Sequence, residues 1–377
     1  MKKFILFFLV CSISFSQKKT IEQRVDSVLA LMNLEEKVGQ LVQYSGGWDT
    51  GTQTVKPSEA HEKLINKGKV GSFLNVFGAE STKRLQKIAV EESRLKIPLI
   101  FGLDVIHGFR AIFPVPLAEA CTWEPELIQL SARWQATEAA STGLHWTFNP
   151  MVDIARDPRW GRIVEGSGED PYLGSLMAAA RVKGYQGKNL SANNTIVACA
   201  KHFAGYGGAE GGRDYNTVDM SERTFRDVYL KPFHAAVKAG VGTLMSSFNE
   251  IGGVPQSGSH FLLTDILRKE WGFDGFVVSD WNSVGELISH GVAKDLKQAA
   301  ELGIKAGVDM DMEASAYFNY LADLVKEGKV SNEIFDESVK RVLRIKFRLG
   351  LFDDPYKYCN SEYEKKTILN NEIVKAT

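Results

Sequence analysis

The sequence predicts an α/β protein built on a closed (β/α)8 barrel, and three observations lead to this prediction. Short apolar runs typical of buried parallel strands alternate with amphipathic helical stretches. Seven such runs fall within about 250 residues, a spacing that favours a closed barrel with one further strand over an open doubly wound sheet. The length of 377 residues, with 44% hydrophobic and 24% charged residues, suits such a soluble barrel with insertions.

Each expected strand is a short run of mostly apolar residues, and the runs cover 70–77, 97–103, 146–154, 196–200, 241–248, 276–279 and 307–312. Each expected helix repeats apolar residues at three- and four-residue spacing, and these stretches include 21–42, 124–142, 223–239, 262–270, 296–306 and 334–349. The last helix ends before Gly350, and no Gly/Ser-rich linker or internal repeat interrupts the chain before that point.

Residues 1–16 have the features of a secretory signal peptide. Lys2 and Lys3 precede an apolar run at 4–13, and small residues follow at 14–16. The run is too short for a membrane anchor, which needs about 20 apolar residues. Val10 before Cys11 argues against a lipoprotein signal. We therefore expect a periplasmic or secreted protein without a membrane anchor.

Cysteine count and net charge exclude several classes of protein. Removal of the signal leaves Cys121, Cys199 and Cys359, an odd number without a CxxC pair, so neither a disulfide framework nor a zinc site is predicted. The 45 Lys and Arg residues balance 46 Asp and Glu residues, for a formal charge of −1. Without a basic excess, nucleic acid is not an expected partner.

Polar residues follow several of the predicted strands directly. Asp104, Lys201 with His202, Asn249 and Asp280 each come at the carboxyl end of an apolar run. A single aspartate after a strand is more often a helix cap or turn residue. In a barrel, however, these ends converge on one face, so four such cases together predict one pocket.

Three segments add chemical detail to this pocket. Residues 101–108 place Asp104 between glycines, where its carboxylate can approach the paired hydroxyls of a sugar. Residues 157–170 combine Trp160 with arginines and carboxylates, which suits a sugar ring or a surface ion-pair loop. The glycine run at 205–212 lacks the Lys-Ser/Thr of a phosphate-binding loop, which argues against nucleotide binding.

The segment 266–283, with Gly-Phe-Val-Val-Ser-Asp-Trp at 275–281, resembles the signature of glycoside hydrolase family 3. Further matching segments occur in the family's order at 102–104, 157–162, 201–203, 245–249 and 343–352. The resemblance implies that residues 20–350 form the family's N-terminal (β/α)8 barrel, with Asp280 as nucleophile. It also implies a set of residues that hold the sugar of the −1 subsite: Asp104, Arg162, Lys201, His202 and Arg213, with Met245 and Trp281 lining it. Phe248 stands where many relatives have Tyr.

The chemistry of a retaining glycosidase agrees with these roles. Such an enzyme needs an ionised carboxylate below the anomeric carbon and a protonated acid about 5 to 5.5 Å away. Lys201, His202 and the arginines would favour the ionised form of Asp280 and bind hydroxyls. Trp281 offers a flat face to the sugar. Standing alone, Lys201 and His202 would instead suggest a buried ion pair and a core histidine.

The general acid is absent from the motifs. In two-domain relatives a Glu of the C-terminal α/β sandwich domain supplies it, and residues 351–377 resemble the start of a linker to that domain. The N-acetylglucosaminidase branch uses a His in an Asp-Ser-His pattern, which the loop 210–216 lacks. We therefore expect a single catalytic barrel that lacks the sandwich domain in cis, and that alone is weakly active or inactive.

The expected reaction is hydrolysis that releases terminal β-D-glucose from a neutral β-linked oligosaccharide or glycoside, with no cofactor and no metal. A β-xylosidase, a β-N-acetylhexosaminidase and a non-catalytic sugar-binding barrel stay open as alternatives. A metal-dependent barrel enzyme is a further alternative, because Asp309, Asp311 and Glu313 offer oxygen ligands. Against it, Ala314 occupies the position at which a calcium-binding loop requires Gly. The sequence leaves the oligomeric state open, a homodimer included.

Overall fold

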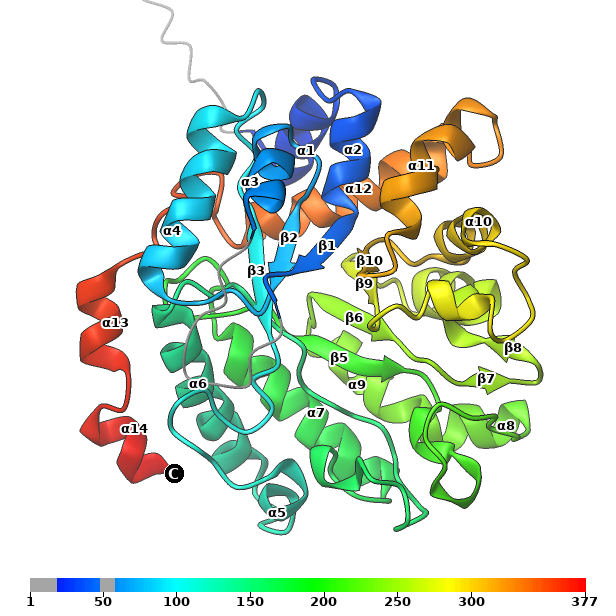
Figure 1. Ribbon diagram of the computed structural model, residues 1–377. Helices are drawn as coiled ribbons and strands as arrows, with labels where there is room; N and C mark the ends of the chain where they lie inside the picture. Colours follow the sequence, from blue (N-terminus) through cyan, green and yellow to red (C-terminus); the bar gives the residue numbers. More distant parts are fainter. Residues whose placement is uncertain (1–18, 48–57) are drawn as a thin grey trace, which may run out of the picture.

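The computed structural model describes residues 19–47 and 58–377, and a ring of short parallel strands lies at its centre (Figure 1). The strands of the ring are β1 (Val42–Ser45), β2 (Ser72–Leu74), β3 (Ile100–Leu103), β4 (Trp146–Thr147), β5 (Cys199–Phe203), β6 (Thr243–Ser246), β9 (Phe276–Ser279) and β10 (Asp311–Met312). The signal peptide expected at 1–16 lies outside the described residues.

The ring consists of two arcs that are joined at both ends. One arc has the order β10-β1-β2-β3-β4 and the other β5-β6-β9, and all of these pairs are parallel. Parallel bridges join the arcs: Trp146 to Val197 and Met151 to Lys201 at one end, and Val278 to Met310 at the other. The strands therefore close in sequence order, which confirms the predicted (β/α)8 barrel.

The strand that the sequence analysis missed is β1. The expected helix 21–42 instead forms α1 (Ile21–Leu29), α2 (Leu34–Gln40) and then β1. Asn33 restarts the helix as a capping box: its side chain accepts the Glu36 backbone N–H, and the Glu36 side chain accepts the Asn33 N–H. The prediction of one continuous helix was wrong for this reason.

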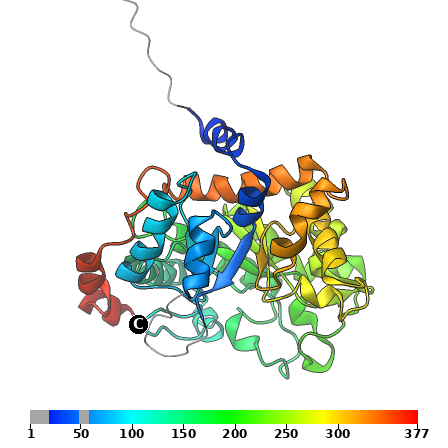
Figure 2. The ribbon, with the colours of Figure 1, turned by 45° about the horizontal axis from the view of Figure 1, so that its top comes forward.

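The helices surround the ring (Figures 1 and 2). The α-helices after α2 are α3 (Glu59–Asn66), α4 (Ala79–Lys87), α5 (Pro116–Ala120), α6 (Pro125–Ser141), α7 (Pro171–Gln186), α8 (Glu222–Thr224), α9 (Lys231–Lys238), α10 (Leu296–Ala306), α11 (Ala316–Lys326), α12 (Asn332–Arg348), α13 (Ser361–Thr367) and α14 (Asn371–Ala376). Thus α6, α10 and α12 match predicted helices. The expected helix 262–270 is a π-helix, Phe261–Glu270, and a π turn at Phe225–Tyr229 separates α8 from α9.

A small antiparallel hairpin extends from the end of β6. It consists of β7 (Glu250–Ile251) and β8 (Val254–Pro255). Gly252 and Gly253 form its turn with φ of 60° and 78°, a left-handed conformation that glycine adopts without steric cost. The hairpin follows Asn249 and therefore lies at the end of the barrel where the strands finish.

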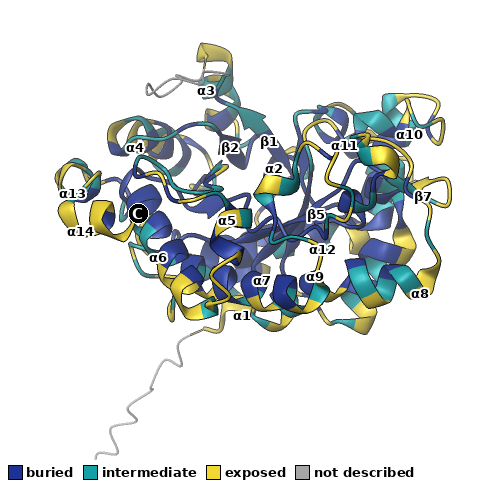
Figure 3. Cartoon of the chain, turned by 90° about the horizontal axis from the view of Figure 1, so that it is seen from below, coloured by how far each residue is buried: buried dark blue, intermediate teal, exposed yellow. Residues whose placement is uncertain are grey.

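The core occupies the ring and the inner faces of the helices. The strands of the ring are mostly buried, while the outer helix faces are exposed (Figure 3). Large side chains such as Phe73, Phe101, Trp146 and Phe276 are fully buried among the strands. This packing makes the barrel a rigid support for side chains at the strand ends.

Residues 351–377 lie against the side of the barrel. The Leu369 N–H donates to the Glu138 carboxylate of α6 at 2.9 Å, and the Ala79 N–H donates to Glu364 at 3.0 Å. Their interpretation as the start of a linker stays a prediction. Among residues 19–47 and 58–377, no helix is both long and apolar enough to cross a membrane.

Candidate active site

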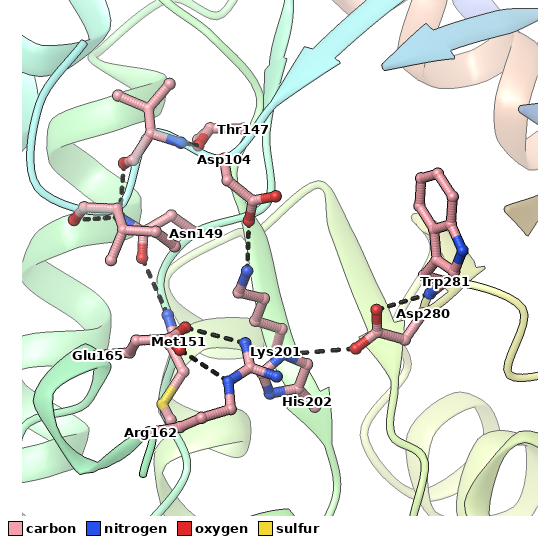
Figure 4. Close-up of polar contacts among 12 residues, drawn as sticks. Asp104, Thr147, Asn149, Met151, Arg162, Glu165, Lys201, His202, Asp280 and Trp281 are labelled. Carbon is pink, nitrogen blue, oxygen red and sulfur yellow. Dashed lines mark hydrogen bonds and ion pairs between the residues drawn. The ribbon is translucent and has the colours of Figure 1, made fainter. Parts of the chain in front are cut away.

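A cavity of about 770 Å³ opens at the carboxyl ends of the strands. It brings together seven of the predicted site residues, which come from positions on or after β3, β4, β5, β6 and β9: Asp104, Arg162, Lys201, His202, Met245, Asp280 and Trp281. The convergence expected from the strand ends is therefore present for three of the four cases, whereas Asn249 is buried and does not line the cavity. Figure 4 shows several of these side chains facing one another.

Asp280 follows β9 and has a buried carboxyl group. Its Oδ1 accepts the backbone N–H of Trp281 at 2.6 Å. Its Oδ2 is buried and makes no hydrogen bond within the described part of the chain, although Nε2 of His202 lies 3.5 Å away. Burial raises the pKa of Asp280 to about 6, and the charge of Lys201 and the Trp281 N–H oppose this rise.

Lys201 lies within β5 and not after it, because the strand continues beyond the predicted end at residue 200 to Phe203. Its Nζ donates to Oδ1 of Asp104 at 2.5 Å (Figure 4). Consecutive strand residues normally face opposite sides, yet Lys201 and His202 both line the cavity. The register of β5 against β6 shifts between Ala200 and Phe203. Lys201 and His202 lie within this irregular part of the strand, where the alternation of side-chain directions is not expected to hold.

His202 is buried between two carboxyl groups. Its Nδ1 lies 2.8 Å from Oδ2 of Asp153, and its Nε2 faces Asp280. Tyr206 packs edge-on against the imidazole with ring centroids 5.0 Å apart. The ring is therefore held on three sides. Burial lowers the pKa of His202 well below its usual value.

Arg162 is held by a carboxylate that the sequence analysis did not select. Its guanidinium donates two hydrogen bonds to Glu165, at 2.7 and 2.9 Å. Burial raises the pKa of Glu165, but the bonds from Arg162 outweigh it, so the pKa is lowered overall. The spacing of three residues between a basic and an acidic residue was the signal available in the sequence.

Aromatic side chains line the cavity, among them Tyr215, Phe248 and Trp281. Trp281 is 38% exposed and Tyr215 is 49% exposed, whereas Phe248 is buried. The rings of Tyr215 and Phe248 have centroids 4.5 Å apart. Exposed rings beside charged groups provide the apolar face that the C–H side of a sugar needs.

Glu286 also lines the cavity, on the 3-10 turn Gly285–Leu287 that follows Asp280. Burial raises its pKa, and the charge of Asp280 adds to this effect. No motif pointed to Glu286, since a glutamate in the Glu-Leu-Ile segment at 286–288 resembles an ordinary helix residue.

Arg213 is the one residue of the predicted −1 subsite that does not line the cavity. It is exposed after the 3-10 turn Glu210–Gly212, and its Nε donates to the Glu210 carbonyl at 3.3 Å. The expected contact of Arg213 with a sugar stays a prediction.

The carboxylates considered as metal ligands have other partners. Asp309 is fully buried, with Arg268 at 2.6 Å and Arg341 at 2.9 Å. Asp311 accepts the backbone N–H of Tyr317 at 3.0 Å. Within the described ranges, no group of three or more His, Cys, Asp or Glu side chains could hold a metal ion.

A (β/α)8 barrel with a buried carboxylate, cationic donors and exposed rings at the strand ends has the architecture of a sugar-processing barrel enzyme. The comparison with protein families agrees with this class. Residues 33–345 match the model of the glycosyl hydrolase family 3 N-terminal domain. The chain belongs to this family, as the sequence motifs predicted.

The relatives in sequence include a periplasmic β-glucosidase of Salmonella typhimurium. That protein is 42% identical over 89% of this chain and 43% of its own length. A putative β-xylosidase of Formosa agariphila is 37% identical over 94% of this chain and 51% of its own length.

Among solved structures, the β-glucosidase of Listeria innocua in complex with isofagomine is 41% identical, with a TM-score of 0.87. The match covers 94% of this chain and 49% of that one. The chain thus spans about half the length of the relatives it matches.

Proposed function

We propose that this chain is the barrel of a retaining β-glucosidase and that Asp280 is its nucleophile. The observation that carries the proposal is Oδ2 of Asp280, a buried carboxylate oxygen in the cavity without a hydrogen-bond partner in the described structure. An oxygen without a donor keeps its electron pair available for the anomeric carbon, while the Trp281 N–H holds the other oxygen at 2.6 Å.

The surrounding groups suit the same reaction. Asp104 and the Lys201 amine can bind paired hydroxyls, and the positive charge of Lys201 favours the ionised form of Asp280. Trp281 supplies an apolar face. The substrate is then a neutral β-linked glycoside that loses a terminal glucose, as the names of the β-glucosidase relatives also suggest.

The proton for the leaving group has to come from another acid. In the cavity, Asp104 forms an ion pair with Lys201, and the ion pair with Arg162 lowers the pKa of Glu165, which favours its ionised form. We expect the acid to be a group beyond the described residues, as the family resemblance implies for two-domain members. We also expect an exported protein, because residues 1–16 have the features of a signal peptide.

Covalent trapping tests the proposal without depending on the acid. A 2-deoxy-2-fluoro-β-glucoside with a dinitrophenolate leaving group needs no protonation, and the fluorine slows hydrolysis of the glycosyl enzyme. Mass spectrometry should find the sugar on the peptide that contains Asp280, and Asp280→Asn should remain unlabelled. No label, or a label on another residue, would overturn the proposal.

A β-xylosidase is the second candidate, because relatives at 37% and 40% identity carry this name. The matching fluoroxyloside should label Asp280 more slowly than the glucoside. Faster labelling by the xyloside would reverse the order of the two candidates.

A further inference from the structure

Asp153 is a buried residue that no motif singled out, and the backbone places it beside His202. The segment after β4 runs parallel to β5: the Lys201 N–H donates to the Pro150 carbonyl at 3.0 Å, and the Val152 N–H donates to the Lys201 carbonyl at 2.8 Å. This register places Asp153 next to His202, buried at the end of the barrel where the strands finish.

Three side chains then form a line that ends at the proposed nucleophile. Oδ2 of Asp153 accepts the backbone N–H of His202 at 2.9 Å and lies 2.8 Å from its Nδ1. The Nε2 atom on the other side of the ring lies 3.5 Å from Oδ2 of Asp280 (Figure 4). The side chains of Asp153 and His202 are each 1% exposed, so water does not compete for these contacts.

These distances restrict the possible positions of the protons. A contact of 2.8 Å between Nδ1 and Oδ2 of Asp153 is a hydrogen bond and contains one proton. A carboxyl proton donated to Nδ1 leaves a neutral imidazole whose N–H is on Nε2. A carboxylate that accepts Nδ1–H can instead pair with a doubly protonated imidazole. In both arrangements Nε2 carries a hydrogen and directs it toward Asp280. In a third arrangement a carboxylate accepts Nδ1–H from a neutral ring and Nε2 is bare. Its lone pair would then face Oδ2 of Asp280 at 3.5 Å and be repelled by it, so the forms with Nε2–H are favoured.

We propose that Asp153 is a positioning residue that occupies Nδ1 of His202 and thereby fixes the Nε2–H form that faces Asp280. The inference rests on the proposed role of Asp280 as nucleophile. At 3.5 Å the Nε2–H group makes no hydrogen bond that would occupy the electron pair of Oδ2, but its dipole would orient Asp280 and stabilise its negative charge before the attack.

The protonation preferences of the two buried groups agree with this arrangement. Burial raises the pKa of Asp153 to about 8, which favours the neutral carboxyl that donates to Nδ1. Burial also lowers the pKa of His202, which favours the neutral ring. The nearby cations Arg162 and Lys201 have Glu165 and Asp104 as partners.

The substitution Asp153→Asn reverses the tautomer with little change in shape. The backbone N–H of His202 can only donate, so the amide oxygen of Asn has to take the place of Oδ2. An oxygen that is only an acceptor draws the ring proton to Nδ1. Nε2 then presents a lone pair to the Asp280 carboxylate and repels it. A similar substitution in the serine-protease triad lowers kcat about 10⁴-fold through the wrong tautomer.

Nitrogen NMR of the ¹⁵N-histidine-labelled chain reads the tautomer directly. His202 is assigned from the signal lost in His202→Asn, and His145 is an internal reference because its Nδ1 accepts the Phe101 backbone N–H at 3.1 Å. We expect a protonated Nε2 on His202 in the wild type and Nδ1–H in Asp153→Asn, with His145 unchanged. A bare Nε2 in the wild type would overturn the inference even if the variant fails to fold, and so would an unchanged tautomer in a folded variant.

The rate of labelling by the fluoroglucoside gives a second readout. We expect Asp153→Asn to lower the rate of labelling at saturating reagent by roughly 100-fold, with a smaller change in the reagent concentration for half-maximal rate. Asp157→Asn is the matched control, since Asp157 lies on the same segment, pairs with Arg159 and does not line the cavity. It should stay within about 2-fold of the wild type.

The two proposals fail in different ways. Absence of label on Asp280 in the wild type refutes the proposed function. A labelled wild type with an equally fast Asp153→Asn refutes only the positioning role.

Discussion

The Nζ atom of Lys201 lies 2.5 Å from Oδ1 of Asp104, a residue 97 positions away in the sequence. The lysine side chain is 5% exposed and the aspartate side chain 52%. The buried ammonium group of Lys201 is thus neutralised by a carboxylate that is partly exposed to solvent. A sugar hydroxyl can bind the exposed side of this carboxylate while the ion pair with Lys201 stays intact.

The first prediction concerns the pH dependence of the wild type. Asp280 reacts as an anion, and its pKa is raised by burial to about 6. The rate of labelling by the fluoroglucoside should reach a plateau near pH 7 and fall about tenfold per pH unit well below pH 6. A rate that stays constant down to pH 4 would contradict the raised pKa.

Removal of the positive charge at position 201 should shift the pH dependence of the labelling rate to higher pH. Lys201 lowers the pKa of Asp280, so Lys201→Met should raise that pKa and shift the acid limb to higher pH. Labelling should therefore be lost at pH values where the wild type still reacts. Lys69→Met, which removes a surface lysine paired with Glu35, should leave the profile unchanged. A downward shift in Lys201→Met would refute the electrostatic role.

Glu286→Gln tests the remaining carboxyl group of the cavity. If the leaving-group proton comes from beyond the described residues, this variant should hydrolyse activated and unactivated β-glucosides within about 3-fold of the wild-type rates. Steady-state rates with a dinitrophenyl glucoside and a disaccharide measure this. A selective loss on the disaccharide, with the activated substrate unaffected, would identify Glu286 as the acid.

Asp309 should be important for stability. It lies fully buried between Arg268 and Arg341 and accepts the Val277 N–H of β9 at 2.7 Å. Asp309→Asn leaves buried guanidinium charge uncompensated and should lower the free energy of unfolding by about 3 to 5 kcal/mol in urea titrations. Glu35→Gln, which removes the exposed pair with Lys69, should cost at most about 1 kcal/mol.

A chelator should not change labelling or hydrolysis. In the 309–313 segment, Asp309 is paired with two arginines and Oδ2 of Asp311 accepts the Tyr317 N–H. Among the described residues, no cluster of three or more His, Cys, Asp or Glu side chains could hold a metal ion. Dialysis against EDTA, followed by the labelling assay, checks this expectation. A loss of activity that a divalent cation restores would revive the metal-dependent alternative.

The sequence predicted the barrel and most of the cavity because strand ends carry local signals. Asp104 and Asp280 follow apolar runs, and parallel strands bring such ends to one face. The strand β1 was missed because it has only four residues and directly follows the capped helix α2, so its apolar residues continue the helical pattern.

The residues that orient others were harder to predict. Asp153 acts on His202 only because the backbone after β4 pairs with β5, and this pairing joins segments 50 residues apart without a local pattern. Glu286 lies on a turn whose position depends on the end of β9. For Arg213, the motif gave an expected role, while the loop directs the residue to the surface.

The two arcs of the ring have a consequence for ligand binding. Asp104 belongs to the arc that contains β3, whereas Lys201, Met245 and Asp280 belong to the arc of β5, β6 and β9. A sugar that contacts Asp104 and Asp280 together spans the junction and links the halves from inside. Sugar binding should therefore stabilise the hydrogen bonds that join the two arcs. The backbone amides of Val197, Lys201 and Val152, which donate across this junction, should exchange their hydrogens more slowly when the cavity is occupied.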